Sequence, residues 1–534
     1  MRHVAFVAGM VMAAAAAAAQ ETHQHADAGR FGTVAFANTC SAAVQPAFLR
    51  GVALLHSFEF GPAIDAFTQV AAADPSCGIA YWGIGLAEWN NPFSLVKRTP
   101  RQLQAGRATA ERATAAGAKS ERERGFIEAI AVLYAAPDTI DQRTRITAYR
   151  DVMSRLSAKF PEDTEAAAFH AVALAAAADP ADKTYADQLK AGATLEKLWK
   201  AQPDHPGLAH YIIHSYDVPA LASHAADAAR RYASIAPDAP HALHMPSHTF
   251  TRLGYWEDSI ATNLLSAAAA KKAGQVYEEL HAMDYTVYAY LQTGQDAKAK
   301  ALVDAAPGVA AQANATAGAA PPAAGGYASA AIPARYALER GAWAEAARLQ
   351  PQASSAPYIE AISWFARGLG AARGGMPGGG SDVQPELQSR IDQLKAGGEN
   401  YWAEQVTIQK LTVAAWVALA QGKTAEALAS MREAADREDR TEKAAISPGP
   451  LAPARELLAE MLLQVKQPKE ALAEFEKTMA KEPNRFRGVA GAIAAAEQLG
   501  DRATAKRLAE RLRTIAAKGD TPGRPALAAA RAMQ

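Results

Sequence analysis

The stretch that decides the fold runs from Gly51 to Gly85 and reads GVALLHSFEFGPAIDAFTQVAAADPSCGIAYWGIG. Within it, Gly51, Ala63, Phe67, Pro75 and Gly85 stand at offsets of 0, 12, 16, 24 and 34. Small, aromatic and proline positions that recur with a period of about 34 residues are typical of a unit built from two packed helices. The first prediction is therefore a stack of helix pairs.

The same period returns further along the chain. Pro203 and Pro237 are one such period apart, and Ala471, Phe475 and Pro483 repeat the small–aromatic–proline spacing. Five glycines stand where the turn between the two helices of a unit is expected, namely Gly254, Gly294, Gly341, Gly422 and Gly500. These offsets match the tetratricopeptide repeat (TPR), so we expect an all-α superhelical solenoid of helix-turn-helix pairs with a concave inner face.

The composition agrees with this prediction. Hydrophobic residues make up 50% of the 534 residues, aromatic residues only 7%, and alanine, the best helix former, supplies much of the apolar share. The 55 Lys and Arg balance 55 Asp and Glu, so the formal net charge is zero. A nucleic-acid partner is not expected, because neutralising phosphates requires a basic surplus.

Shifts in composition divide the chain into blocks. Two stretches rich in Gly, Pro and Ala have no helical period and are expected to be flexible connections. The expected division is 1–19 signal peptide, 20–37 flexible tail, 38–304 N-terminal TPR block, 305–330 linker, 331–367 middle helical repeat, 368–385 Gly-rich linker, 386–520 C-terminal TPR block and 521–534 tail.

The segment 1–19 is typical of a cleaved secretory signal. Arg2 precedes an apolar run from Val4 to Ala19, which ends in three alanines before Gln20. This run is mostly alanine and spans only about 24 Å, so it suits a membrane anchor less well. We therefore expect a periplasmic or secreted protein without a membrane span.

Cys40 and Cys77 are the only two cysteines. An oxidising compartment favours a disulfide between them, closing a ring that would stabilise the fold by about 3–4 kcal/mol. The alternative is a pair of unrelated buried thiols.

Most of the 13 histidines fall between residues 205 and 281, and their phase is informative. His210 and His214 take positions 5 and 9 in the first helix of one repeat, and His244 and His248 follow one period later at the same positions. Residues four apart share one helical face. Because adjacent repeats stack these faces, the four imidazoles are expected to converge in the concave groove.

Further residues face the same way and extend this site. The following repeat adds His281 at position 2 and Asp284 at position 5, while Asp217 and Arg252 lie at positions 12 and 13 of the earlier repeats. The predicted metal ligands are His210, His214, His244, His248 and His281. The candidate catalytic residues are Asp217, Arg252 and Asp284, with Asp217 as a ligand or a general base.

Imidazole and carboxylate ligands without cysteine suit a transition metal such as Zn, Fe, Cu or Mn. An open coordination position would activate water and predict a hydrolase, whereas a redox-active metal would permit an oxidoreductase. Two alternatives remain open. One is a metal-free scaffold whose groove binds a small molecule, a peptide or a protein partner; the other is a set of histidines packed between helices.

Two further histidines are less clear from the sequence. Pro246 stands inside the His244–His248 pair and is tolerated only in the first turn of a helix, so this helix is expected to start near 242–244. His241 would then lie in the preceding loop. His56 takes position 13 of the first repeat, where a lone histidine is more often structural.

Several strings resemble a bacterial family of exported TPR proteins. They are His241-Ala242-Leu243-His244-Met245-Pro246-Ser247-His248, Asp284-Tyr285, Ser447-Pro448-Gly449-Pro450 and Pro483-Asn484-Arg485. The resemblance covers nearly the whole mature chain and implies a repeat solenoid, with no settled activity to carry over. Relatives carry a histidine near Asn90–Asn91, where this sequence departs, so no role is carried over to that position.

Overall fold

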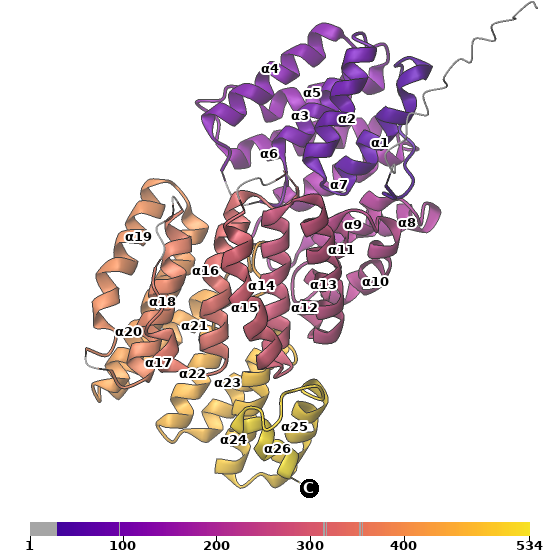
Figure 1. The fold of residues 1–534 in the computed structure, drawn as a ribbon. Helices are drawn as coiled ribbons and strands as arrows, with labels where there is room; N and C mark the ends of the chain where they lie inside the picture. Colours follow the sequence, from indigo (N-terminus) through magenta and orange to yellow (C-terminus); the bar gives the residue numbers. More distant parts are fainter. Residues whose placement is uncertain are drawn as a thin grey trace, which may run out of the picture.

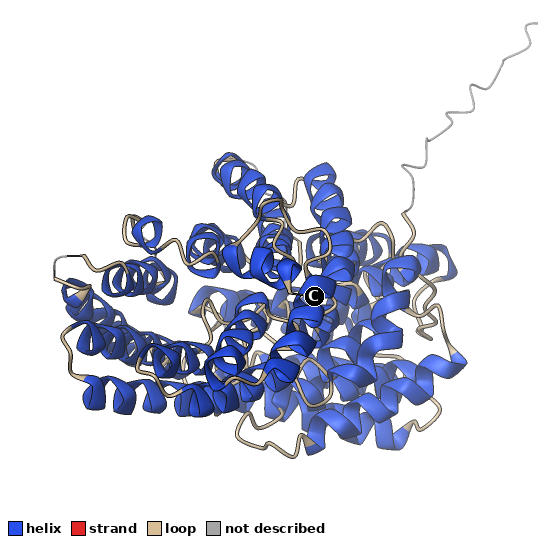
Figure 2. Cartoon of the chain, turned by 90° about the horizontal axis from the view of Figure 1, so that it is seen from below, coloured by secondary structure: helices blue, strands red, loops and turns tan. Residues whose placement is uncertain are grey.

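The computed structural model describes residues 29–94, 97–312, 316, 318–351, 354, 356–376 and 378–533. Within these ranges the chain is all-α, with helices α1 to α26, three short 3-10 helices and no strand (Figures 1 and 2). This confirms the predicted fold class. The signal peptide expected at 1–19 lies outside the described residues, as does part of the tail expected at 20–37.

The helices of the first half are α1 Gln45–His56, α2 Phe60–Ala73, α3 Gly78–Trp89, α4 Pro100–Ala116, α5 Glu121–Leu133, α6 Gln142–Lys159, α7 Thr164–Ala177, α8 Ala186–Ala201, α9 Pro206–Ser215, α10 Ala226–Ile235, α11 Pro240–His244, α12 Pro246–Leu253 and α13 Trp256–Ala273. The second half contains α14 Val276–Gln292, α15 Asp296–Ala310, α16 Pro322–Glu339, α17 Trp343–Ala346, α18 Pro357–Arg373, α19 Gln384–Ala396, α20 Asn400–Ala420, α21 Thr424–Asp439, α22 Ala454–Gln464, α23 Pro468–Lys481, α24 Phe486–Leu499, α25 Arg502–Ile515 and α26 Pro525–Ala532. The 3-10 helices are Ala42–Val44, Ala222–Ala225 and Ser381–Val383.

The turns between paired helices lie where the repeat register places them. All five predicted turn glycines follow the first helix of a pair and have a positive φ: Gly254 (68°), Gly294 (65°), Gly341 (66°), Gly422 (78°) and Gly500 (74°). Glycine adopts this left-handed conformation without the steric cost that a Cβ atom imposes. The register read from the sequence is therefore confirmed along most of the solenoid.

The small–aromatic spacing of the repeat marks close helix packing. A Cβ atom added to Gly51 would lie 2.9 Å from the Phe67 ring, and one added to Gly83 would lie 2.5 Å from it. Near the other end of the chain, a Cβ atom on Gly491 would lie 2.1 Å from the Phe475 ring. The glycines are required because the aromatic rings occupy the space that a side chain would fill.

Three apolar clusters hold the solenoid together. The first extends from Phe36 to Phe250 over α1 to α12, and the second extends from Tyr327 to Ala530 over α16 to α26. A third, smaller cluster on α13 to α16 lies between them. In Figure 1, α1 to α7 form the upper part, α9 to α15 the middle, and α23 to α26 the lower end.

The connections between blocks are shorter than the sequence predicts. Helix α16 begins at Pro322 and replaces the last third of the linker expected at 305–330, while α15 extends to Ala310. Helix α18 continues to Arg373, and α26 occupies much of the expected tail at 521–534. Proline is tolerated in the first turn of a helix, and alanine favours the helix that follows. Helices therefore extend into segments whose composition suggested a linker.

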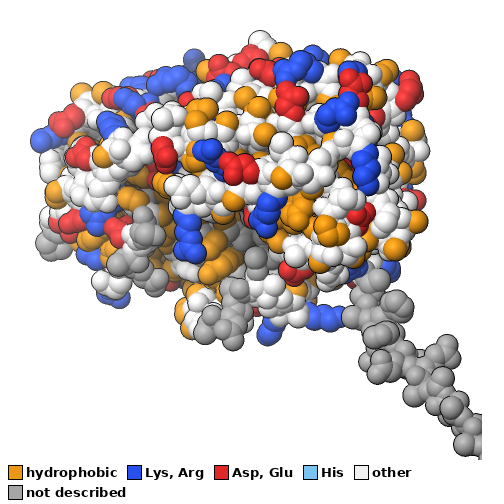
Figure 3. Space-filling model, turned by 90° about the horizontal axis from the view of Figure 1, so that it is seen from above, with side chains coloured by type: hydrophobic (Ala, Val, Ile, Leu, Met, Phe, Trp, Pro, Cys, Tyr) orange, Lys and Arg blue, Asp and Glu red, His pale blue; other side chains and the backbone are white. Residues whose placement is uncertain are grey.

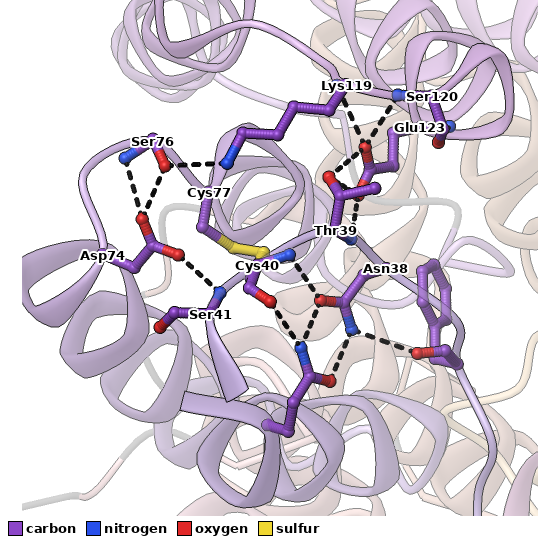
Figure 4. The surroundings of a disulfide bond; sticks show 12 residues. Asn38, Thr39, Cys40, Ser41, Asp74, Ser76, Cys77, Lys119, Ser120 and Glu123 are labelled. Carbon is purple, nitrogen blue, oxygen red and sulfur yellow. Dashed lines mark hydrogen bonds between the residues drawn. A yellow bond between two sulfur atoms is a disulfide. The ribbon is translucent and has the colours of Figure 1, made fainter. Parts of the chain in front are cut away.

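The predicted disulfide between Cys40 and Cys77 is confirmed, with the two Cα atoms 4.9 Å apart (Figure 4). The surrounding polar contacts fix the segment before α1. The Glu123 carboxylate accepts a hydrogen bond from the Thr39 backbone N–H at 2.7 Å and another from the Thr39 hydroxyl at 2.8 Å. The disulfide and this carboxylate together hold the N-terminal segment against α3 and α5.

The surface carries interspersed charges of both signs, as Figure 3 shows for one face. No helix in the described part of the chain combines the length and apolar character needed to cross a membrane.

Candidate metal centre

Six histidines meet in the interior of the central repeats. They are His210 and His214 on α9, His241 and His244 on α11, His248 on α12 and His281 on α14. Their exposed fractions range from 0 to 8%. Figure 1 places these helices together in the middle of the molecule. The structure thus brings together all five predicted metal ligands and adds His241.

The position of His241 corrects one prediction. Helix α11 begins at Pro240, and Met245 keeps helical backbone angles before α12 begins at Pro246. Pro246 lacks the N–H that would bond the carbonyl of Ala242, so the helix is interrupted at that point. The expectation that it starts near 242–244 is therefore wrong, because Pro240 itself provides the first turn. His241 lies in this turn and faces the other histidines.

The first group consists of His210, His214 and His241. One ring nitrogen from each residue lies within 4.8 Å of the other two. The Nε2 atoms of all three are buried and have no hydrogen-bond partner among the described residues. A buried polar atom without a partner costs free energy, and three of them in one place need a shared explanation.

Two outer nitrogens in this group, those of His210 and His241, are held by oxygen acceptors. His210 Nδ1 lies 2.7 Å from the backbone carbonyl oxygen of His56, and His241 Nδ1 lies 3.2 Å from Glu278 Oε1. Glu278 is fixed in turn by the Ala320 N–H, which donates to its other oxygen at 2.9 Å. Metal-binding histidines characteristically donate the proton of one ring nitrogen in this way, which leaves the other nitrogen free to bind.

The second group consists of His244, His248 and His281, and its geometry is more constrained. The Nε2 atoms of His244 and His248 lie 3.1 Å apart. His244 Nδ1 faces Asn263 Oδ1 at 2.7 Å, and Asn263 is oriented by its own donation to the Ser259 carbonyl at 2.7 Å. His248 Nδ1 faces a carboxylate oxygen of Asp217 at 2.8 Å.

These contacts determine which nitrogen carries the proton in the rings of His244 and His248. Each Nδ1 faces an oxygen that can only accept, so Nδ1 carries the proton in the neutral ring and Nε2 carries a lone pair. The Nε2 lone pairs of His244 and His248 then point at each other and repel. A cation bound between the two nitrogens would remove this repulsion. Two nitrogens at 2.0–2.1 Å from one tetrahedral zinc ion are about 3.3 Å apart, close to the observed separation.

Asp217 links the second group to two buried cations. Its carboxylate accepts hydrogen bonds from Arg252 Nε at 3.0 Å and from Lys443 Nζ at 3.1 Å, in addition to His248. Burial alone would raise the pKa of Asp217, but Lys443, Arg252 and His248 together hold it well below its usual value. Asp217 therefore stays ionised and orients His248 from outside the cluster of imidazoles.

Five of these imidazoles, those of His210, His214, His244, His248 and His281, have a pKa below the physiological range. Burial lowers the pKa of His248 to about 4 and that of His281 to about 3. Burial, reinforced by the neighbouring imidazoles, also holds the pKa of His210, His214 and His244 well below the usual value. Neutral imidazole is the form that binds a metal ion, so no proton has to be displaced at neutral pH.

A small cavity adjoins both groups. Its volume is about 30 Å³. It is lined by side chains of both groups and their neighbours, by three loops and by α16: His214, His241, Met245, His248, Glu278, His281, Asn91, Ala319 to Pro321, Ala445, Ile446 and Ala324. This volume holds one or two water molecules. Asn91, where the sequence departs from the family it resembles, is thus part of the lining.

Asp284 belongs to neither histidine group. Its carboxylate forms a fully buried ion pair with Arg335, at 2.8 Å between Oδ1 and Nε. The same guanidinium donates to the Ser447 hydroxyl at 2.9 Å and to the Gly449 carbonyl at 3.0 Å. Arg335 therefore joins Asp284 to the segment before α22, and Arg252 is linked to His248 through Asp217.

A third buried group contains His56, His205 and Glu165. Glu165 lies 2.8 Å from His56 Nε2 and 3.2 Å from His205 Nε2, one oxygen to each ring. His56 Nδ1 lies 2.9 Å from the Tyr211 hydroxyl. Both nitrogens of His56 thus have partners. This agrees with the structural role that the sequence favours for it.

Residues of the site that the sequence analysis missed come from outside the histidine register. Asn263 lies on α13, the second helix of its repeat, and Lys443 is 226 residues from Asp217 in sequence. Glu278 is not among the missed residues: it lies three residues before His281 on the same face of α14, and the sequence already offers it as an alternative to Asp217.

The helix pairs and their turn glycines define a TPR-like helical repeat protein. No protein-family profile matches the chain, and no curated protein matches it. Among solved structures, the chain is similar to a human IFIT1 dimer with m7Gppp-AAAA, with a TM-score of 0.34 and 10% identity over 82% of this chain and 90% of that one. It is also similar to a monomeric IFIT1 mutant with Gppp-AAAA, with a TM-score of 0.35 and 11% identity over the same shares. For the P58(IPK) TPR domain the TM-score is 0.19 at 10% identity, over 92% of this chain and 100% of that one. These values are too low to carry any argument about function.

Proposed function

We propose that this protein binds transition-metal ions through the two histidine groups inside its TPR-like solenoid. The observation that carries the proposal is the pair of Nε2 atoms of His244 and His248, 3.1 Å apart with both outer nitrogens held by oxygen acceptors. The unpartnered Nε2 atoms of His210, His214 and His241 add a second convergence of lone pairs.

His56 serves as an internal comparison. It is as deeply buried as the six proposed ligands, yet both of its ring nitrogens have partners. Histidines that serve packing are satisfied in this manner. In the proposed metal groups the outer nitrogens of His210, His241, His244 and His248 have oxygen acceptors while their inner nitrogens face other imidazoles, which favours ligation over packing.

A metal-free groove for a peptide is less well supported. An imidazole surface that grips a peptide has to be accessible, whereas these six side chains are at most 8% exposed. The adjoining cavity of about 30 Å³ has room for water and not for a peptide residue. For the same reason the proposal does not extend to hydrolysis or oxidation of larger substrates. An exported location remains part of the proposal and is supported by the Cys40–Cys77 disulfide.

The test is elemental analysis of the full chain purified without an affinity tag. We expect at least one equivalent of a transition metal, and less than half of that in a His244→Ala/His281→Ala double variant. The matched control is His224→Ala, because His224 is exposed and lies outside all three groups. A metal-free protein that takes up no added Zn²⁺ or Cu⁺ would overturn the proposal.

A further inference from the structure

The two histidine groups adjoin each other, so ions bound in them would be neighbours. The ring centroids of His241 and His244 are 6.0 Å apart, and those of His214 and His248 are 6.1 Å apart. Each group supplies three nitrogens of its own within 4.8 Å of one another. Six nitrogens divided into two sets of three are the ligand supply for two ions with three imidazoles each.

No carboxylate takes part in either set among the described residues. Asp217 and Glu278 both contact an outer Nδ1 and leave the inner nitrogens to the ion. Arg252 and Lys443 contribute two buried positive charges next to Asp217, and the carboxylates of Glu442 and Glu482 act on the same guanidinium. The ligands that an ion here would meet directly are neutral imidazoles.

Neutral ligands discriminate between ions by charge. Two divalent ions held only by imidazoles would bring four positive charges into the interior, whereas two monovalent ions would bring two. Uncompensated buried charge is costly, so the surroundings favour the monovalent ion.

A thioether side chain lines the same cavity. Met245 separates the two helical segments that carry His241, His244 and His248, is fully buried, and lines the cavity between the two groups. Thioether sulfur favours Cu⁺, while imidazole accepts copper as readily as zinc. Copper also heads the affinity order of the divalent first-row metals, so its oxidised form would be retained.

We propose that the two groups form a paired copper site, one ion in His210, His214 and His241 and the other in His244, His248 and His281, with Met245 favouring Cu⁺. This inference rests on the proposed function and specifies its metal and its stoichiometry.

The experiment is an anaerobic titration of the metal-free full chain with Cu⁺, in competition with a chromophoric Cu⁺ chelator, and a parallel titration with Zn²⁺. We expect two equivalents of Cu⁺ per chain, bound more tightly than Zn²⁺. Met245→Leu conserves volume and removes the sulfur, and should weaken Cu⁺ binding by about tenfold, the scale seen for residues that support metal ligands, while Zn²⁺ binding stays unchanged. Met153→Leu is the matched control, because Met153 is equally buried in α6, far from the histidines in the chain.

The outcomes separate the two proposals. Binding of a single Cu⁺, or tighter binding of Zn²⁺ than of Cu⁺, would overturn the paired copper site and leave metal binding intact. A Met245→Leu variant with unchanged Cu⁺ affinity would overturn the role of the thioether. Failure to bind either ion would overturn the proposed function itself.

Discussion

Asp217 is the residue whose substitution tests the site most directly. Its carboxylate contacts His248 Nδ1 at 2.8 Å, Arg252 Nε at 3.0 Å and Lys443 Nζ at 3.1 Å. Asp217→Asn keeps the shape of the side chain and removes its charge. The orientation of His248 is then no longer fixed by a carboxylate, and two buried cations lose their counterion.

Two losses of different size follow. The side chains of Arg252 and Lys443 are 3% and 4% exposed, and removing one partner of a buried ion pair costs about 3–5 kcal/mol. We expect Asp217→Asn to lower the free energy of unfolding of the metal-free protein by about 3 kcal/mol, the lower end of this range. The loss is limited because Lys443 can lose its proton, since burial already lowers its pKa to about 8. Metal affinity should fall by about 10–100-fold, the range for residues that orient a metal-binding histidine.

A second substitution separates these effects. Adding Lys443→Met to Asp217→Asn removes the unpaired ammonium, so part of the stability should return while the metal affinity stays low. Stability is measured by urea unfolding of the metal-free protein, followed by circular dichroism, and affinity by competitive metal titration. An Asp217→Asn variant with wild-type metal affinity would refute the argument that Asp217 orients His248. So would a double variant that regains its affinity together with its stability.

Three further predictions concern the rest of the molecule. The pKa of His248 is about 4 in the folded state and about 6.5 in an unfolded chain, so between these pH values the unfolded state binds more protons. The free energy of unfolding of the metal-free protein should therefore fall by about 3 kcal/mol through this residue as the pH drops from 6.5 to 4. Urea titrations at a series of pH values should show this fall and a plateau above about pH 7. Asp284→Asn breaks the buried pair with Arg335 and should lower stability by about 3 kcal/mol while metal titrations stay unchanged; lost metal binding would instead place Asp284 in the site. Replacing Cys40 and Cys77 by serine removes a cross-link that spans 37 residues and should lower the free energy of unfolding by about 3–4 kcal/mol. A reductant added to the wild type should have the same effect. Equal urea midpoints for the oxidised wild type and the serine variant would contradict this prediction.

The fold could be predicted because its signals are local and periodic. The glycines at 254 and 500 were assigned to turns from spacing alone, and both adopt the left-handed conformation. The linkers were predicted too long because Ala, Gly and Pro occur both in loops and in helices or their first turns. Proline at 322 opens α16, and a run of alanines that breaks the repeat period still forms a helix once its neighbours bury it.

The site was predictable only as far as the repeat register reaches. His210 and His244 were paired because one repeat period separates equivalent positions, and the structure places both in the interior, in adjacent groups. The repeat positions do not predict the contact of Asn263, which lies on the second helix of its pair, with His244. Nor do they predict the contact of Lys443, which belongs to the C-terminal block, with Asp217. Such partners depend on how the solenoid closes on itself, which no single repeat encodes.

This closure connects the site with the architecture. The segment between α21 and α22 covers the second histidine group: Lys443 binds Asp217, and the hydroxyl of Tyr285 lies 3.2 Å from the Ala445 carbonyl and 3.1 Å from that of Ser447. Tyr285 is four residues after His281 on α14. An ion held by His248 and His281 would therefore order the residues to which the C-terminal block is docked. Since a ligand that binds only the folded state stabilises it, metal loading should stabilise the contact between the central helices and the segment between α21 and α22.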